Sequence, residues 1–272
     1  ADSRHHKDRA TYSTESASKR RGDPQIGGHD AIWRVAVSAL PLLIAWGLWL
    51  WRLNGSDLTF DETATYVVAA RPLLNILTYL RGAVREHPPV YYLLVHGWMA
   101  AAGASEFSLR LFSVCTGLIA LALAGWVARV MTKQPMAAIF PTVFLAVTPG
   151  MAYYVRDARM YSLGVVWTLL SAGLFLRDWL PERHWPDRAA LVGLTAVHLL
   201  ALFTHYYLLL PILVQPLALL IARRWRPLLA WCAIHALPAV ALVAWLMLAP
   251  AHQATAMSML HFNPNPPTAG QV

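Results

Sequence analysis

The stretch Leu58-Thr59-Phe60-Asp61-Glu62-Thr63 lies a few residues after the first long apolar run of the chain, residues 33–53. It places two adjacent carboxylates, Asp61 and Glu62, at the edge of that run. Ionisable groups so close to a bilayer cost free energy, and they are therefore functional candidates by default. We expect the fold to be that of a membrane protein which presents this stretch on the face away from the cytoplasm.

The composition is typical of an integral, multi-pass membrane protein. Of the 272 residues, 57% are hydrophobic and 13% are charged, whereas an ordinary soluble domain has about 25% charged residues. The apolar residues come in repeated runs of about 20, the length that a helix needs to cross a bilayer. The runs are continuous and lack the alternation of a barrel, so we predict an all-α fold, a polytopic transmembrane helical bundle.

The formal net charge of +8 does not indicate a nucleic-acid partner. The basic residues are spread over short loops and one tail, a distribution that fits membrane topology better than a nucleic-acid footprint. Cys115 and Cys232 lie within apolar runs and have no metal-ligand spacing, so we expect free, packed thiols.

Three regions follow from the composition. Residues 1–32 are polar, and we expect a disordered cytoplasmic tail. Residues 33–250 hold the apolar runs and form the expected transmembrane domain. Residues 251–272 are rich in Pro and Asn, and we expect an extracytoplasmic tail at which the chain is truncated.

Residues 54–105 form the predicted first external loop. Within it, residues 62–81 are too polar to span and predict an amphipathic helix in the interface, broken at Pro72. Residues 88–103 offer about 16 apolar positions, fewer than the usual 17 to 25. We therefore expect a re-entrant or interfacial helix there.

This interpretation fixes the topology of everything that follows. With residues 88–103 not crossing, the basic loops near residues 129–133, 177–188 and 223–226 all lie inside, as the positive-inside rule requires. The predicted spans are then seven: 33–53, 107–131, 135–154, 162–179, 189–203, 208–222 and 228–249. The same count places all the reactive side chains on one face, outside the cytoplasm.

Arg156 and Arg159 flank Asp157 in the second outer loop, on the side where arginine is disfavoured. The planar fork of a guanidinium suits a phosphate, so we expect both arginines to bind the phosphate of a lipid-linked substrate, with Tyr161 assisting. Asp157 is a candidate second acid, substrate ligand or cation ligand. The alternative is snorkelling of the arginines at the interface, or pairing with Asp157.

Histidines mark two other parts of the chain. Glu86 and His87 stand before two prolines that suit a first helical turn, and we expect both to bind substrate, or His87 a metal. His205 precedes two tyrosines and is a further candidate for substrate binding, although an interfacial aromatic belt explains that segment nearly as well. The remaining histidines of the apolar runs are expected to bond between helices: His96, His198 and His235.

Four motifs in order resemble one family: Phe60-Asp61-Glu62, His87-Pro88-Pro89-Val90-Tyr91-Tyr92, Ser105-Glu106-Phe107-Ser108-Leu109-Arg110-Leu111 and Ala158-Arg159-Met160-Tyr161-Ser162-Leu163. They are similar to motifs of the protein mannosyltransferase-like and aminoarabinose transferase-like enzymes, glycosyltransferases of the C superfamily (GT-C). The resemblance covers roughly residues 33–245. It implies a multi-helix membrane fold and a polyprenyl-phosphate-linked sugar as donor. Members of this family usually carry further spans beyond the point where this chain stops.

The resemblance also implies roles for the carboxylates of the opening stretch. Asp61 would be the catalytic base, or would orient the acceptor. Glu62 would orient Asp61 or help hold a divalent cation, Mg²⁺ or Mn²⁺, for which His87 and Asp157 are the other candidate ligands. No cofactor is certain on this basis. The structural alternative is that both carboxylates stabilise the positive end of a helix.

The expected function is transfer of a sugar from polyprenyl phosphate to an acceptor hydroxyl outside the cytoplasm, at the bacterial inner membrane. The acceptor can be a protein, a lipid or a glycan. The chain has no Gly-rich phosphate loop and no stretch long enough for a nucleotide-binding domain, which favours a lipid-linked donor. The alternatives are a transporter or lipid flippase whose pathway is lined by the same charged edge, and a donor-binding scaffold that is inactive alone.

Overall fold

The computed structural model of this chain describes residues 39–82, 87–181 and 185–247. The predicted tails, residues 1–32 and 251–272, and the candidate Glu86 lie outside the described residues. The chain divides into two compact units, Ala1–Pro41 and Leu42–Val272. Apart from residues 39–41, every described residue belongs to the second unit.

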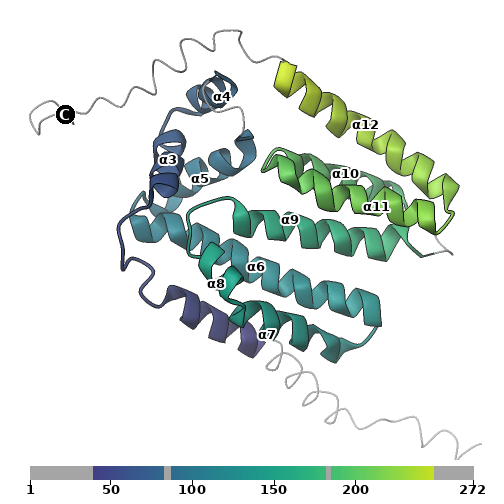
Figure 1. Cartoon of the computed structure of the whole chain (residues 1–272), viewed down its shortest axis with the longest axis horizontal. Helices are drawn as coiled ribbons and strands as arrows, with labels where there is room; N and C mark the ends of the chain where they lie inside the picture. Colours follow the sequence, from purple (N-terminus) through teal and green to yellow (C-terminus); the bar gives the residue numbers. More distant parts are fainter. Residues whose placement is uncertain (1–38, 83–86, 182–184, 248–272) are drawn as a thin grey trace, which may run out of the picture. The chain divides into compact units, whose positions relative to one another are not determined.

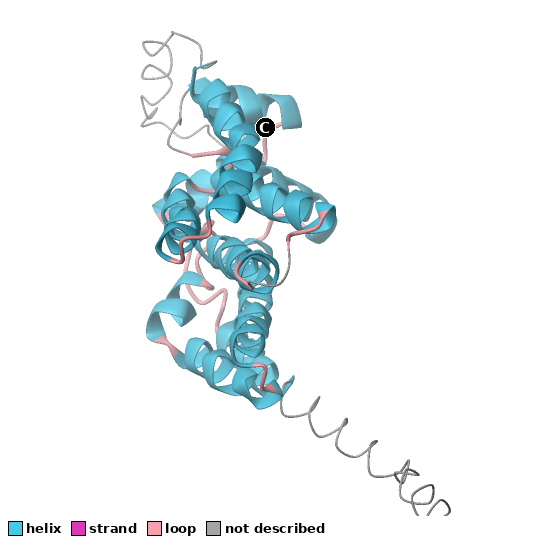
Figure 2. Ribbon diagram, turned by 90° about the vertical axis from the view of Figure 1, so that its right-hand side faces the viewer, coloured by secondary structure: helices cyan, strands magenta, loops and turns pink. Residues whose placement is uncertain are grey.

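Every regular element of the described residues is helical, and Figure 2 shows helices and loops without a strand among them. The all-α class is therefore confirmed. Helix 39–50 comes first and is followed by the two short helices of the predicted external loop, α3 (Phe60–Ala69) and α4 (Leu73–Gly82). The expected break of the amphipathic segment is confirmed, because Pro72 lies between them.

Helix α5 (Pro89–Ala102) has 14 residues and opens with proline in its first turn, as expected from its sequence. Helix α6 (Glu106–Thr132) has 27 residues and covers the whole of predicted span 107–131. The Ser105 side chain caps its start by accepting from the Ser108 amide, and Lys133 ends it in the left-handed conformation, with φ of 59°.

The helices after α6 match the predicted runs with one interruption. Predicted span 135–154 is divided into η1 (Pro135–Ala138), α7 (Ile139–Val147) and α8 (Pro149–Tyr154). The break between α7 and α8 lies at Thr148, because the residue before Pro149 is held in an extended conformation. Helix α9 (Tyr161–Leu174) continues into the π-helical turn η2 (Phe175–Trp179). The last elements are α10 (Arg188–Leu202), η3 (Tyr206–Leu208), α11 (Leu209–Ile221) and α12 (Trp225–Met247), and Figure 1 shows α10 to α12 alongside one another.

Close contact between α6 and α9 depends on a missing side chain. A Cβ added to Gly173 of α9 would lie 1.9 Å from the ring of Trp126 in α6, so only glycine admits this approach. Near the other end of α9, a Cβ added to Gly117 of α6 would lie 2.5 Å from Val155, so a second glycine admits the loop at residues 155–160 that precedes α9.

Two helices of the described residues, α6 and α12, are long and apolar enough to cross a membrane. Four other apolar helical segments are shorter: Ala39–Leu50, Pro135–Val147, Arg188–Leu202 and Tyr206–Ile221. Membrane association is thus supported, whereas the seven-span topology stays a prediction. Large apolar side chains of the last two helices are nevertheless exposed, among them Leu210, Val214, Ile221, Leu237, Val240 and Met247.

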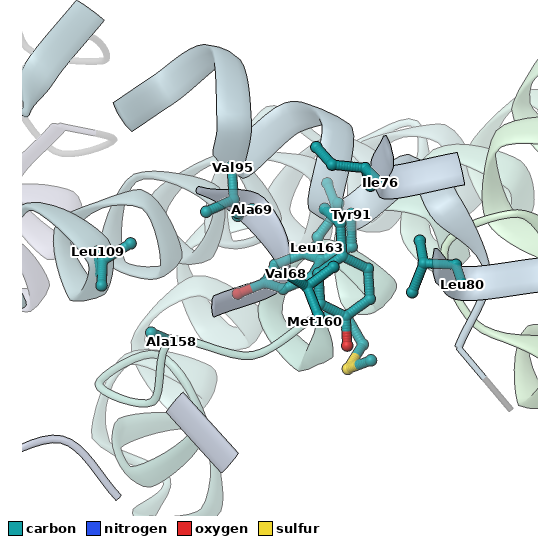
Figure 3. Packing of buried hydrophobic residues seen from close by; sticks show 11 residues of the cluster. Val68, Ala69, Ile76, Leu80, Tyr91, Val95, Leu109, Ala158, Met160 and Leu163 are labelled. Carbon is teal, nitrogen blue, oxygen red and sulfur yellow. The ribbon is translucent and has the colours of Figure 1, made fainter. Parts of the chain in front are cut away.

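A hydrophobic cluster anchors the short helices of the external loop to the start of α9. Figure 3 shows Val68 and Ala69 of α3 gathered with Tyr91 and Val95 of α5, and Met160 is fully part of this core. The cluster buries one side of α3 and leaves its first turn beside the loop at residues 155–160.

Candidate functional site

Glu62 lies in the first turn of α3 and is held from three directions. Its Oε2 accepts from the Thr59 amide at 2.9 Å, which completes a capping box with the Thr59 hydroxyl. Its Oε1 accepts from the Ala158 amide at 3.0 Å. Arg110 of α6 grips both oxygens, with Nε at 2.8 Å from Oε1 and Nη2 at 2.7 Å from Oε2. Each carboxylate oxygen therefore accepts two hydrogen bonds.

Arg110 is equally saturated. Besides its two bonds to Glu62, its Nη1 donates to the carbonyls of Leu53 and Ser56 at 3.0 and 2.8 Å, and its Nη2 donates to the carbonyl of Asp57 at 3.0 Å. All five N–H donors of the guanidinium are thus used. The two side chains are only 4% and 2% exposed. This ion pair ties the segment after helix 39–50, α3, α6 and the loop before α9 into one unit.

Glu62 stays ionised in this setting. Burial pushes its pKa up, but the hydrogen bonds from Arg110, Thr59 and Ala158 outweigh burial and leave the pKa below its ordinary value. A carboxylate with no free acceptor position is poorly placed to take a proton or a metal ion, so the geometry favours a positioning role for Glu62.

Asp61 has the opposite environment although it is the adjacent residue. One step along a helix rotates the side chain by about 100°, which turns Asp61 outward where Glu62 turns inward. Its side chain is exposed, and its carboxylate accepts no hydrogen bond from the residues that the structure describes. Only its carbonyl is engaged, by the Thr65 hydroxyl and by Nη1 of Arg159 at 3.3 Å. Asp61 is therefore the free carboxylate of this turn.

Arg159 lies next to Asp61 and is 6% exposed. It forms no ion pair within the described residues, and its buried Nε has no hydrogen-bond partner there. Its electrostatic neighbours are Tyr92, Asp61 and Tyr161. A buried guanidinium without a direct ion pair is costly, and an anionic ligand is an ordinary way to offset that cost.

Asp157 joins the same group from the loop before α9. Its Oδ1 is buried and has no hydrogen-bond partner among the described residues. Burial, followed by the negative charges of Glu62 and Asp61, raises the pKa of Asp157 to about 6, against the opposing effect of Arg159 and Arg110. Asp157 is therefore easier to protonate than an ordinary aspartate.

Arg156 and Arg159, predicted to act as a pair, have different surroundings. Nη2 of Arg156 donates to the carbonyls of Trp51 and Arg52, each at 3.0 Å. Arg156 lines a cavity of about 470 Å³ that Arg159 does not line. The loop thus places Arg159 next to Asp61 and Arg156 in a separate cavity. Asp157 lines that cavity and also interacts with Arg159.

The histidine candidates approach this group from α5 and α10. The Val90 amide donates to the Phe203 carbonyl at 2.8 Å, which brings the start of α5 to the end of α10. The His87 ring lies 6.1 Å from that of Tyr92, centroid to centroid. Burial and the charge of Arg159 lower the pKa of His205, so this ring is a neighbour of the same arginine.

Arg159 thus has Asp61, Asp157, Tyr161 and His205 as electrostatic neighbours, together with Tyr92. Within the described ranges no group of three His, Cys, Asp or Glu side chains is arranged to hold a metal ion, so Glu62, His87 and Asp157 do not form such a group.

Arg110 is the functional residue that the sequence reasoning missed as such. It is a charge at the start of the apolar run 107–131, and an ionisable residue in that position signals a specific partner. The spacing of Thr59 and Glu62 is likewise the sequence pattern of a capping box, which predicts that Glu62 turns back toward the helix start.

The three histidines expected to bond between helices do so, which confirms that prediction. His96 Nδ1 lies 2.8 Å from the carbonyl oxygen of Ala69 in α3. His198 bonds to Ser171 of α9 through Nε2 and to His235 of α12 through Nδ1. Gln215 of α11 donates to Ser171 at 2.6 Å, so this buried network joins four helices.

Comparison with protein-family models, with curated proteins and with solved structures gives no match to this chain.

Proposed function

We propose that this protein is a multi-pass membrane glycosyltransferase, which moves a sugar from a polyprenyl-phosphate donor to an acceptor hydroxyl on the outer face of the bacterial inner membrane. The observation that carries the proposal is the juxtaposition of Arg159, a buried guanidinium with no ion-pair partner in the described residues, and Asp61, an exposed carboxylate with free acceptor positions. One side chain suits a phosphate and the other suits a hydroxyl proton.

The reaction assigned to this pair is a single displacement. The acceptor oxygen attacks the anomeric carbon as the bond from that carbon to the phosphate oxygen breaks. Asp61 takes the proton of the acceptor hydroxyl, and the phosphate departs with the bonding electron pair. Arg159 stabilises the charge that develops on the departing phosphate, in a buried position where such an interaction is strong.

The setting supports a lipid-linked donor. Two helices are long enough to span, and exposed apolar side chains cover α11 and α12, an arrangement suited to lipid and unusual for a water-facing surface. In the proposed topology the stretch at Asp61 and the loop at Arg159 share the outer face, where the donor phosphate would lie at headgroup level.

Glu62 and Arg110 have a positioning role in this proposal. Their ion pair fixes the first turn of α3 against the loop before α9, through the bond from the Ala158 amide. Asp61 lies on α3 and Arg159 lies in that loop, so the distance between these two side chains depends on the Glu62–Arg110 ion pair.

The experiment that tests the function is transfer of radiolabelled sugar from polyprenyl-phosphate donors in membranes that contain the full chain. We expect Asp61→Asn and Arg159→Gln each to reduce transfer on the order of 100-fold or more. The matched control is Asp57→Asn, because Asp57 is an exposed carboxylate of the same segment whose carbonyl alone is engaged. Equal transfer by the wild type and Asp61→Asn, at equal protein levels, would remove Asp61 from the mechanism.

A further inference from the structure

A second group of charged side chains lines the cavity of about 470 Å³ beside Arg156. Its walls come from the segment after helix 39–50, from α8 and from the loop before α9. The side chains that matter are Arg52, Ser56, Tyr153, Arg156 and Asp157, with the Glu62–Arg110 pair at the same wall. A cavity of this size suits a small ligand or a headgroup.

The charges of the cavity do not cancel. Arg110 is neutralised by Glu62 and has every donor occupied. Arg52 and Arg156 form no ion pair with any described carboxylate, although Asp157 lines the same cavity. Two guanidiniums therefore face one carboxylate, and the cavity is suited to an anion.

Arg156 is held in place for such a role. Its Nη2 is fixed by the carbonyls of Trp51 and Arg52, which leaves Nε and Nη1 without a partner in the described part of the chain. Arg52 itself has φ of 53°, a left-handed conformation that costs a non-glycine residue about 1 kcal/mol. The backbone turn at this residue supplies one of the two carbonyls that hold Arg156.

Asp157 adds a second requirement for the ligand. Its Oδ1 is buried and has no hydrogen-bond partner among the described residues, so this oxygen needs a hydrogen-bond donor. A hydroxyl group on the ligand would supply that donor. A ligand that satisfies the cavity thus carries an anionic group for the two arginines and a hydroxyl for the aspartate.

We propose that this cavity binds a polyol phosphate, in which Arg52 and Arg156 hold the phosphate and Asp157 accepts a hydrogen bond from a neighbouring hydroxyl. The group can belong to a lipid headgroup of the glycerol-phosphate type or to a soluble phosphate, and the chemistry is the same. This site is separate from the donor phosphate position at Arg159, and its occupation does not require sugar transfer.

The test uses the purified full chain in a non-ionic detergent and measures binding by calorimetry with no sugar donor present. The probes are dihexanoyl-phosphatidylglycerol, glycerol 3-phosphate and, as the zwitterionic control, dihexanoyl-phosphatidylcholine. We expect phosphatidylglycerol to bind and phosphatidylcholine not to bind. If glycerol 3-phosphate binds equally well, the phosphate and hydroxyl suffice, and if it does not, the site is one for a lipid headgroup.

The variants separate this site from general attraction to a basic protein. Arg52→Gln and Arg156→Gln should each weaken phosphatidylglycerol binding on the order of tenfold, the effect of losing a charge-assisted hydrogen bond. Arg226→Gln is the matched control, because Arg226 is an exposed arginine outside the cavity. Should Arg156→Gln fail to fold, Arg52→Gln carries the test alone.

Asp157→Ala, which removes the acceptor oxygens that asparagine would partly keep, distinguishes the two halves of the ligand. It should weaken binding of glycerol 3-phosphate more than binding of inorganic phosphate, which has no polyol hydroxyl. The proposal is overturned if no phosphate probe binds, if phosphatidylcholine binds as well as phosphatidylglycerol, or if Arg226→Gln weakens binding as much as Arg52→Gln.

Discussion

Arg110 and Arg159 are nearly equally buried, but their hydrogen-bond partners differ. Arg110 meets Glu62 through two bonds and three backbone carbonyls through the rest of its donors. Within the described residues, Arg159 makes a long bond of 3.3 Å to the carbonyl of Asp61, interacts with the Tyr161 side chain, and keeps a buried Nε without a hydrogen-bond partner. A polar group that the fold satisfies completely serves the fold, whereas one that the fold leaves unsatisfied is available for a ligand.

The largest expected effect is loss of the satisfied pair. Glu62→Gln and Arg110→Met should each lower the free energy of unfolding by about 3–5 kcal/mol, because each leaves the partner charge buried and unpaired. The measurement is titration with a denaturing detergent in mixed micelles. Asp178→Asn, which breaks the exposed pair with Arg177, is the control and should cost under about 1 kcal/mol. A similarly small loss for Glu62→Gln would contradict the claim that the Glu62–Arg110 ion pair stabilises the fold.

The second effect is a loss of activity without a loss of stability. Arg159→Gln removes a buried charge that has no ion-pair partner in the described residues, so the free energy of unfolding should stay the same or rise. Transfer from the polyprenyl-phosphate donor should still fall on the order of 100-fold. Both quantities can be measured on one preparation. If Arg159→Gln destabilises the protein as much as Arg110→Met, then the fold satisfies Arg159 as it does Arg110, and the account of Arg159 is wrong.

A third and smaller effect is a pH dependence that belongs to Asp157. Its pKa rises from an ordinary value of 3.8 to about 6 in the folded protein, so the folded state binds more protons than the unfolded state between these values. Stability due to this group therefore falls as the pH rises from about 4 to about 6, by on the order of 1–2 kcal/mol after solvent screening.

The comparison of wild type with Asp157→Asn isolates this contribution. Glu62 acts in the opposite sense, because its lowered pKa gives stability that is lost at acid pH. The variant keeps the Glu62 effect and should lose only the decline between pH 4 and 6. Identical pH profiles of unfolding for the two proteins would contradict the assigned burial of Asp157.

The smallest effect concerns the network of four helices around His198. Ser171→Ala removes a hydroxyl that bonds to both His198 and Gln215. We expect a loss of about 1 kcal/mol in the free energy of unfolding, the usual size for one hydrogen bond between membrane helices. Leu210→Ala, at an exposed position of α11, is the control and should cost less. A loss of several kcal/mol would show that this network ranks with the Glu62–Arg110 pair.

Much of the fold could be predicted from local patterns. The length of the apolar run 107–131 gave α6, and the polarity of residues 62–81 with Pro72 gave α3 and α4. These helices depend on residues that are close in sequence, so local sequence patterns suffice to predict them. The interruption between α7 and α8 is also local, because Pro149 stands in the middle of the predicted span.

The sequence predicts which residues form the site, but it does not predict which role each of them has. Asp61, Asp157, Arg159 and His205 were expected on one face, and the structure brings them together. Which carboxylate is satisfied depends on a bond from Arg110 of α6 to Glu62 of α3 across 48 residues. Which arginine shares a cavity with Arg52 depends on the bonds from Arg156 to the carbonyls of Trp51 and Arg52. Such contacts are tertiary, and no spacing within a segment encodes them.

The most direct test of the central claim is the affinity of the purified protein for a short-chain polyprenyl phosphate without sugar. Wild type and Arg226→Gln should bind it with the same dissociation constant, while Arg159→Gln should bind on the order of tenfold or more weakly. If Arg159→Gln binds as tightly as the wild type, the buried guanidinium is not the phosphate site, and the distinction between the two arginines has no functional meaning.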